Sequence, residues 1–368
     1  MIPPEPSQAS VSLWIGTYAG GGGAGVYPLQ GAQAGQDAAG LSVGMPCADA
    51  ANASFGAYSS RFDLHYLVNE QDDGALGIYR RDATALTLVG RVATGGAAPC
   101  HVALDATQSC VAIANYASGS VALYRLDAGG MPIVPPSVHA NTGSGPNAER
   151  QQSPHAHWVG FGLENRFLYA TDLGTDQVLG FAVDQKHGTL GTPHTAFAAP
   201  PGSGPRHLLF HARHPRKAYL ACELTSMLIV LDVEDGLLRH RAALSTLPVD
   251  CTEANIVAHI AANAAGDRLY VSNRGHDSIA VFALDDEGDG RGDGRGEVTP
   301  IQHIASGGAS PRFFLISEDE RRMVVVHERD HRVTMLDILP DGTLAPTDLV
   351  VEIPGAAFAF SSRWRSAA

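Results

Sequence analysis

The chain has few aromatic residues, few cysteines and no long apolar run. Aromatic residues make up 7% of its 368 positions, and no stretch approaches the roughly 20 consecutive apolar residues of a transmembrane helix. We therefore expect no membrane partner. The five cysteines are an odd number and form no C-x-x-C pair, which argues against a disulfide framework and indicates free thiols in a reducing compartment.

Positive charge is also scarce, with 25 Lys and Arg residues against 38 Asp and Glu and a formal net charge of −13. An acidic protein is a poor partner for nucleic acid or an anionic membrane, so we expect it to bind neither. An anionic substrate would need a local cluster of arginine or lysine. The first residues, MIPPEPSQAS, lack the basic and apolar regions of a signal peptide, and we expect a cytoplasmic protein.

Helical periodicity is missing as well, because no segment of ten or more residues carries a clean 3.6-residue period. The 41 glycines and 22 prolines instead suit a protein with many tight turns. One stretch reads as four short strands separated by turn residues, NIVAHIAAN, RLYVSN, SIAVFAL and EVTPIQHIAS, within residues 255–306. This order is typical of a four-stranded antiparallel blade, and the fold class is therefore all-β.

A repeated unit then becomes visible at intervals of roughly fifty residues, a period typical of propellers. Each copy has an apolar triplet followed by a small or polar anchor residue. The anchors are Thr17, Asn69, Asn115, Asp172, Cys222, Asn273 and His327. Nine or ten residues after each anchor comes a large apolar residue: Tyr27, Tyr79, Tyr124, Phe181, Leu231, Phe282 and Leu336.

Seven copies predict a seven-bladed β-propeller formed by residues 1–368 as a single domain. The last apolar segment, AAFAF at 356–360, resembles a first strand without a successor, and SLWIGTY at 12–18 resembles a second strand without a predecessor. We expect both ends of the chain to build the seventh blade together, which closes the ring and leaves no open sheet edge.

Two segments break the pattern. The Gly/Asp/Arg-rich run at 285–297 matches no calcium-loop spacing and is interpreted as a surface loop. The connection at 138–155 is too long for a simple turn, and long loops in compact domains are often functional. It delivers Arg150 and leads into His155 and His157.

In a propeller, the connections into the first strands and the turns after the second strands meet at one mouth of the central channel. The residues entering first strands are Cys100, His101, His155, His157, Arg206, His207, His259 and Arg312. Those leaving second strands are Glu70, Tyr116, Glu223, Arg274, His276 and Glu328. Three of these histidines, His101, His157 and His207, fall in one column of the predicted repeat alignment.

Structural roles are open for several of these residues. His101 and His207 could cap strands, Glu70 and Glu328 could be solvated charges, and Arg312 could form an ion pair between blades. Four residues from consecutive blades carry the catalytic hypothesis: His157, Arg206, Glu223 and Arg274. One imidazole, one carboxylate and two guanidiniums suit general-base chemistry on an anionic substrate. Candidates for substrate binding are His155, Arg150, His101, His207, His276 and Arg312.

Other chemistries find less support. The sequence has no G-x-S-x-G elbow, P-loop or H-E-x-x-H motif. No ligand pair has zinc-like spacing, although His155 and His157 could share one strand face. We therefore predict no metal and no cofactor.

Four segments together resemble one known family: GGAAPCHVALD, SGPNAERQQSPHAHWV, PPGSGPRHL and YVSNRGHDSIAVF. They are similar to the lactonase family of seven-bladed propellers, which includes bacterial 6-phosphogluconolactonases and the fungal 3-carboxy-cis,cis-muconate lactonizing enzyme. The resemblance runs from about Trp14 to the end of the chain. It implies a metal-independent enzyme whose active-site His, Arg, Glu and Arg map onto His157, Arg206, Glu223 and Arg274. Cys222 and His327 stand where the family usually has Asn.

The sequence thus predicts a lactonase that hydrolyses a sugar-acid lactone resembling 6-phosphogluconolactone. Two alternatives stay open. The same groups acting in reverse would give a carboxymuconate-type lactonizing cycloisomerase. A propeller without catalytic activity could bind a peptide or protein at its mouth, but such a surface should be apolar and aromatic rather than charged.

Overall fold

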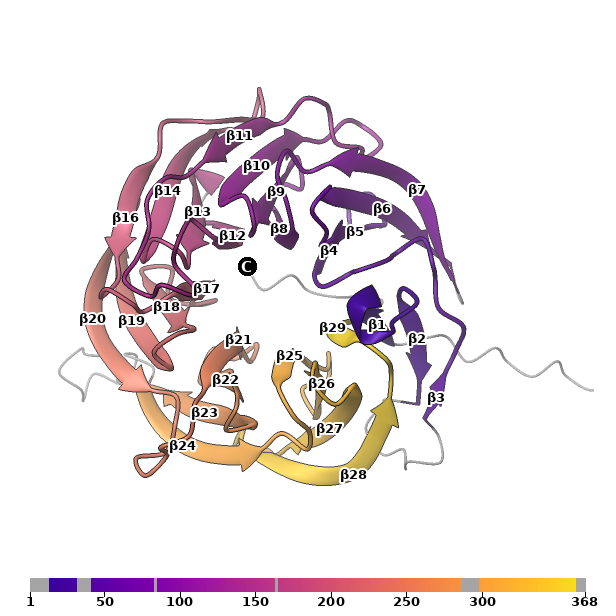
Figure 1. Cartoon of the computed structure of the whole chain (residues 1–368), viewed down its shortest axis with the longest axis vertical. Helices are drawn as coiled ribbons and strands as arrows, with labels where there is room; N and C mark the ends of the chain where they lie inside the picture. Colours follow the sequence, from indigo (N-terminus) through magenta and orange to yellow (C-terminus); the bar gives the residue numbers. More distant parts are fainter. Residues whose placement is uncertain (1–12, 32–40, 83–84, 163–164, 286–297, 362–368) are drawn as a thin grey trace, which may run out of the picture.

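The computed structural model describes residues 13–31, 41–82, 85–162, 165–285 and 298–361. Within these ranges the protein is all-β, apart from one short 3₁₀ turn at Ala19–Gly21. Seven antiparallel sheets follow one another around a common centre, and the first strand of each sheet lies innermost (Figure 1). The fold is the predicted seven-bladed β-propeller. Most of the Gly/Asp/Arg-rich run at 285–297 lies outside the described residues.

The blades are numbered here in chain order. Blade 1 contains β4 (Gly56–Ser59), β5 (Leu64–Asn69), β6 (Ala75–Arg81) and β7 (Leu86–Ala93). Blade 2 contains β8 (Pro99–Leu104), β9 (Cys110–Asn115), β10 (Ser120–Arg125) and β11 (Ser137–Ala140). Blade 3 contains β12 (Ala156–Phe161), β13 (Phe167–Asp172), β14 (Gln177–Asp184) and an outer strand in two pieces, β15 (Thr189–Leu190) and β16 (His194–Ala198).

Blade 4 contains β17 (Pro205–Phe210), β18 (Lys217–Cys222), β19 (Met227–Glu234) and β20 (Leu237–Ser245). Blade 5 contains β21 (Ile256–Ala262), β22 (Arg268–Arg274), β23 (Ser278–Leu284) and β24 (Val298–Ala305). Blade 6 contains β25 (Pro311–Ile316), β26 (Arg322–His327), β27 (Arg332–Ile338) and β28 (Leu344–Glu352).

Blade 7 is assembled from both ends of the chain, as the sequence predicts. Its order is β29 (Ala356–Ser361), β1 (Leu13–Thr17), β2 (Tyr27–Gln30) and β3 (Ser42–Val43). The ladder between β29 and β1 pairs Leu13 with Ser361 and Trp14 with Phe360. The rings of Trp14 and Phe360 also stack, with centroids 6.4 Å apart. This closure joins the first and last segments of the chain in one sheet.

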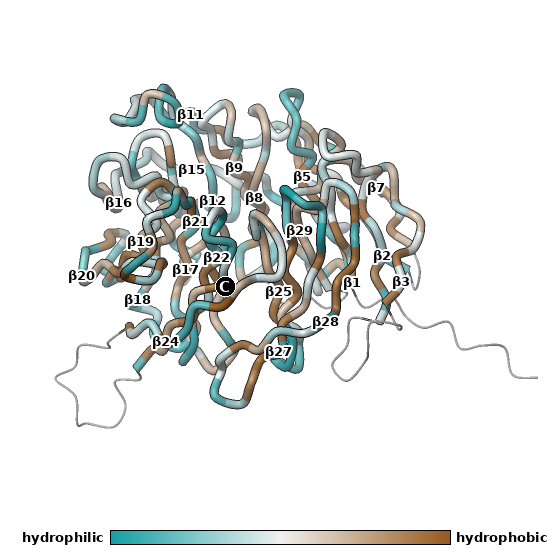
Figure 2. The backbone as a smooth tube through the Cα atoms, turned by 60° about the horizontal axis from the view of Figure 1, so that its bottom comes forward, coloured by the Kyte–Doolittle hydropathy of each residue, from teal (hydrophilic) through white to brown (hydrophobic). Residues whose placement is uncertain are grey.

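The core lies between successive blades, where the inner three strands are covered on both faces. The outer strands face solvent on one side and alternate accordingly, as in β7. The large apolar residues after each anchor stand on the third strands, and those of blades 1 to 6 are buried. Figure 2 shows hydrophobic stretches along strands such as β1 and β25, with hydrophilic residues in many of the connecting turns.

Three of the seven anchor residues tie neighbouring blades together. Asn115 in blade 2 donates its side-chain amide to Thr94 O at the end of blade 1, and Asn273 in blade 5 donates to Thr246 O of blade 4. His327 acts through Thr334, whose hydroxyl bonds both His327 Nε2 and Ser306 O of blade 5. At these three anchors the polar residue is therefore explained by its link to the preceding blade.

The long connection into blade 3 is shorter than predicted, because β11 continues to Ala140 and pairs with β10. The remaining loop is fixed at several points. Gln151 donates to Leu173 O and Asp176 Oδ1, and Asn141 donates to Asp172 Oδ2. The loop therefore holds Arg150 in a defined position above blades 3 and 4.

Candidate active site

A bulge near the start of the first strand presents side chains to the channel. In six of the seven blades the ladder between first and second strands shifts at this point, and such a bulge re-aims the extra residue. Ser54 holds the matching position in blade 1, since the next residue, Phe55, accepts from Val68 N. We call these positions the bulge ring: Ser54, Cys100, His157, Arg206, Ala258, Arg312 and Ala357.

The residues that follow form a second set, which we call the floor ring: Phe55, His101, Trp158, His207, His259, Phe313 and Phe358. Their rings pack against one another, as in the pairs Phe55–His101 and His259–Phe313, with centroids 4.0 and 4.2 Å apart. The predicted column of three histidines is therefore wrong by one residue. His101 and His207 lie in the floor ring, whereas His157 lies in the bulge ring.

Hydrogen bonding defines the tautomers in the floor ring. The guanidinium of Arg206 can only donate hydrogen bonds, so His207 Nε2 must accept from Arg206 Nη1 at 3.0 Å. His207 Nδ1 then carries the proton that bonds His259 Nδ1, 3.3 Å away. Burial, followed by the nearby Arg206, lowers the pKa of His207 well below its usual value and that of His259 to about 3. Both imidazoles are neutral and structural in character.

A third set, the turn ring, follows the anchors directly: Tyr18, Glu70, Tyr116, Leu173, Glu223, Arg274 and Glu328. Sequence reasoning missed Tyr18, although its place after Thr17 repeats that of Glu223 after Cys222. Beneath the turn ring lies a narrow hollow of about 10 Å³, which has room for about one water molecule. Its lining comes from the bulge and floor rings: Ser54, Phe55, Cys100, His157, Arg206, His207, Arg312, Phe313 and Ala357.

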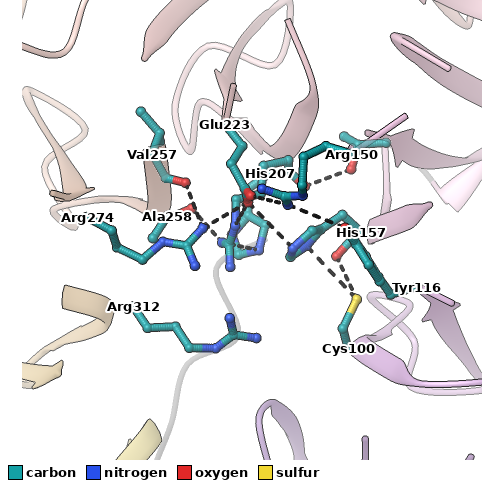
Figure 3. Close-up of polar contacts among 12 residues, drawn as sticks. Cys100, Tyr116, Arg150, His157, His207, Glu223, Val257, Ala258, Arg274 and Arg312 are labelled. Carbon is teal, nitrogen blue, oxygen red and sulfur yellow. Dashed lines mark hydrogen bonds and ion pairs between the residues drawn. The ribbon is translucent and has the colours of Figure 1, made fainter. Parts of the chain in front are cut away.

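Glu223 is the centre of the polar network at the mouth (Figure 3). It is only 2% exposed and forms ion pairs with Arg150 at 2.6 Å, Arg206 at 2.9 Å and Arg274 at 2.9 Å. Burial alone would raise the pKa of Glu223, but Arg274 and Arg206 outweigh it and hold that pKa far below its usual range. Glu223 is therefore a permanent anion that orients three guanidiniums.

Two of these arginines also bond other groups of the protein. Arg206 bonds Glu223 through Nε, and its Nη1 bonds His207 Nε2 at 3.0 Å and Ala258 O at 2.5 Å. Arg274 Nη2 bonds Glu223 and also Val257 O at 3.3 Å. Burial and then Arg274 lower the pKa of Arg206 to about 9, so it stays charged at neutral pH.

His157 faces the hollow from blade 3. Its Nε2 lies 3.9 Å from Glu223 Oε2, and its Nδ1 lies 4.0 Å from Cys100 Sγ. Burial, followed by Arg206, lowers the pKa of His157 well below its usual value, although Glu223 acts in the opposite direction. The imidazole is neutral and able to accept a proton. Burial raises the pKa of Cys100, which keeps its thiol protonated toward Ala156 O and His157 O.

Arg312 differs from the other arginines. Its nearest carboxylate oxygens belong to Glu70 at 3.7 Å and Glu328 at 3.9 Å, and its guanidinium lies 5.2 Å over the ring of Tyr18. Tyr18 in turn donates to Glu70 Oε2 at 2.7 Å. Arg312 is thus fixed by charge and by an aromatic face, and Figure 3 draws no contact from it to the other residues shown.

The remaining candidates lie at the rim or away from it. The ring of His155 stacks on Tyr116, with centroids 4.4 Å apart, and Tyr116 also accepts from Arg150. His276 bonds Ser278 in its own turn and Asn255, which precedes β21, and neither bond reaches the Glu223 network. The structure therefore brings together all the predicted catalytic residues, and it separates His276 from them.

The structure also bears on metals and membranes. Among the described residues, no three His, Cys, Asp or Glu side chains are arranged to hold a metal ion. All five cysteines, each of them described, are free thiols. No helix in the described ranges is long and apolar enough to span a membrane.

The fold and mouth define a seven-bladed β-propeller with a polar site at one end of its channel. The family model of the lactonase, 7-bladed beta-propeller, matches residues 12–359, so this chain belongs to that family and is a lactonase-type enzyme. It is 31% identical to the 6-phosphogluconolactonase of Bacillus subtilis over 353 residues, covering 92% of this chain and 97% of the relative.

Solved structures agree with this assignment. The periplasmic gluconolactonase PpgL of Pseudomonas aeruginosa has a TM-score of 0.83 and 26% identity, with 95% of this chain and 98% of the other covered. A protein from Lactobacillus plantarum has a TM-score of 0.84 and 27% identity, with 96% and 99% covered. The family resemblance noted from the sequence is confirmed over nearly the whole chain.

Proposed function

We propose that the protein hydrolyses an anionic sugar-acid lactone, of which 6-phosphogluconolactone is the model. The observation that carries this proposal is a neutral His157 facing a hollow that Arg206 and Arg312 line, beside a buried carboxylate, Glu223, that is already paired with three arginines. A general base and positive charge are what hydrolysis of an anionic ester requires. The name of the Bacillus subtilis relative supports the phosphorylated substrate.

The reaction begins with water held against His157 in the hollow. As the water oxygen attacks the lactone carbonyl carbon, His157 takes its proton, and the carbonyl oxygen becomes an oxyanion. The ring C–O bond then breaks, and the leaving ring oxygen takes the proton back from His157. The product is an open hydroxy acid, and no covalent enzyme intermediate forms.

The arginines divide the remaining work. Arg150 is the most exposed of the three around Glu223, at 35% of its side chain, and stands at the rim where a phosphate or carboxylate tail would lie. Arg206 and Arg274 are buried, and their charge favours negative charge developing in the hollow. Glu223 is too strongly held as an anion to act as the base, so its role is to fix the arginines.

A panel assay tests this function. Proton release would be followed on aldonolactones with and without a 6-phosphate and on muconolactones, each with and without EDTA. We expect turnover of the aldonolactones, higher kcat/KM for the phosphorylated one, and no loss with chelator. Activity confined to muconolactones would instead favour the cycloisomerase, and no turnover at all would favour a binding scaffold.

His157→Gln tests the base directly. Loss of a general base typically lowers the rate about a hundred- to ten-thousand-fold, whereas the melting temperature should change little because the mouth is not the core. The matched control is His65→Gln, since His65 is a buried histidine packed between Tyr58 and Phe360, outside the site. Full turnover in His157→Gln would remove it from the mechanism.

The cellular location is a separate proposal. Five free thiols and the acidic composition suit a cytoplasmic enzyme. The Pseudomonas aeruginosa neighbour is named a periplasmic gluconolactonase, so the periplasm is the alternative location. Fractionation of the native host with an antibody against the protein would decide between them.

A further inference from the structure

Arg312 has donors that the protein does not use. Among the described residues, none accepts a hydrogen bond from its guanidinium, and its two nearest carboxylates stand 3.7 and 3.9 Å away. Arg312 is nevertheless well buried, with 13% of its side chain exposed, and it lines the hollow beside His157. The five N–H groups of its guanidinium therefore have no protein acceptor among the described residues and stay open to whatever fills the hollow.

Ser54 provides an independent observation at the same place. It is 4% exposed, it lines the hollow with Arg312, and its hydroxyl has no hydrogen-bond partner within the described residues. A buried hydroxyl normally has a hydrogen-bond partner, so its absence here requires an explanation. Two unsatisfied donors facing one small space indicate that a ligand oxygen completes them.

The other basic groups are less suited to that oxygen. Arg206 directs its donors to Glu223, His207 and Ala258 O. Arg274 bonds Glu223 and Val257 O through Nη2, and its buried Nε has no partner among the described residues, but Arg274 is not among the residues that line the hollow. Arg150 stands at the exposed rim. The lactone carbon must lie near the water activated by His157, so its carbonyl oxygen is the ligand atom that reaches the same hollow.

We propose that Arg312 and Ser54 form the oxyanion site of this enzyme, a role that rests on the lactonase function proposed above. When water attacks, the carbonyl π electrons move to oxygen, and Arg312 and Ser54 donate N–H and O–H to the resulting negative charge. When the ring C–O bond breaks, the electrons return and the carbonyl re-forms. No proton leaves either residue.

The surroundings of Arg312 suit this task. Glu70 and Glu328 attract its charge from a distance, and the ring of Tyr18 supports one face of the guanidinium, so its direction is fixed while its donors stay available. Tyr18 bonds Glu70 and thereby holds it in place. Donors fixed before the reaction stabilise an oxyanion without reorganisation. Tyr18 and Glu70 are thus positioning residues for Arg312.

Steady-state kinetics of Ser54→Ala, Arg312→Lys and Arg312→Gln test the assignment on gluconolactone with and without the 6-phosphate. We expect Arg312→Gln to lower kcat about a hundred- to a thousand-fold, as for loss of an oxyanion donor. Ser54→Ala should lower it about tenfold, near the value of one neutral hydrogen bond. For each variant, kcat should fall by the same factor on the phosphorylated and the unphosphorylated lactone. KM should change less than kcat.

Two control variants separate chemistry from folding. Ser59→Ala removes a buried hydroxyl of the same blade that bonds Gln108, and Arg322→Lys alters a buried arginine of the same blade as Arg312 that pairs with Asp337. Both should melt at lower temperature and keep kcat. Ser54→Ala should not lower the melting temperature, and it should lower kcat.

The outcomes are distinct. A rise in KM confined to the phosphorylated lactone would make Arg312 an anchor for the phosphate and overturn the oxyanion role. Unchanged kcat in Ser54→Ala and Arg312→Lys, with wild-type turnover intact, would overturn it while leaving the lactonase function standing. A wild-type enzyme inactive on every lactone would overturn both.

Discussion

Replacing Glu223 by glutamine tests the central feature of the site, a carboxylate that holds three arginines. The variant keeps the shape of the side chain and removes its charge. Arg150 and Arg206 then lose their carboxylate partner, and Arg274 keeps only the more distant Glu328, 3.7 Å away. Breaking a buried ion pair by removing one partner typically costs about 3–5 kcal/mol, because the remaining charge stays buried. We expect a loss of stability in that range.

The loss converts to a measurable shift in melting temperature. With an unfolding entropy of about 2.1 cal/mol/K per residue, a chain of this length shifts by about 1.3 °C per kcal/mol, so the variant should melt about 4–6 °C lower. The pH dependence adds a second check. Since the pKa of Glu223 is depressed in the folded state, its contribution is complete above the ordinary value of 4.5 and declines only below it. The gap between wild type and variant should therefore narrow only in acid.

A double-mutant cycle assigns the effect to the network. Arg150→Ala should cost less stability in the Glu223→Gln background than in wild type, because its partner is already gone. Calorimetry or urea unfolding of the four proteins would give the coupling. A Glu223→Gln variant that melts with the wild type would refute the reasoning, since it would mean that the three charges are solvated or released without cost.

Two further predictions concern pH and closure of the ring. Because the pKa of His157 lies well below its usual 6.5, the base stays unprotonated in mild acid, so kcat/KM should remain level as pH falls through 6.5 and decline only at lower values; a decline centred near 6.5 would contradict the assigned environment. Deleting residues 1–18 removes β1 with the buried Leu13, Trp14 and Ile15, each worth about 2–5 kcal/mol. That sum approaches the whole stability of a typical domain, and circular dichroism should show loss of cooperative folding.

Most of the fold could be predicted from the sequence because each blade repeats the same local sequence pattern. Turn residues, period-two strands and a large apolar residue after each anchor occur seven times, and a propeller is the arrangement that buries all of them. The closure of blade 7 followed from the unmatched strands at the two ends. The split outer strand of blade 3 was not predictable, since it is set by packing against neighbouring strands.

The site was predicted in part. Repeat positions placed His157, Arg206, Glu223 and Arg274 at one mouth, and the structure brings them within one network. The bulges were invisible in the sequence, because an extra residue on one strand changes the register without changing the alternation around it. That shift explains why His101 and His207 were assigned to the column of His157. It also explains why Ser54, which has no charge to attract notice, was missed.

The bulge ring suggests how one repeated backbone produces a specific site. The seven equivalent positions hold Ser, Cys, His, Arg, Ala, Arg and Ala, and all except Ala258 line the same small hollow. The two alanines leave room, the arginines supply charge from different blades, and the histidine and serine supply a proton acceptor and a neutral donor. Because each side chain is held by its own blade, one can change without disturbing the others. Substrate choice within this family should therefore depend chiefly on these positions and on the turn ring above them, rather than on the length of the loops.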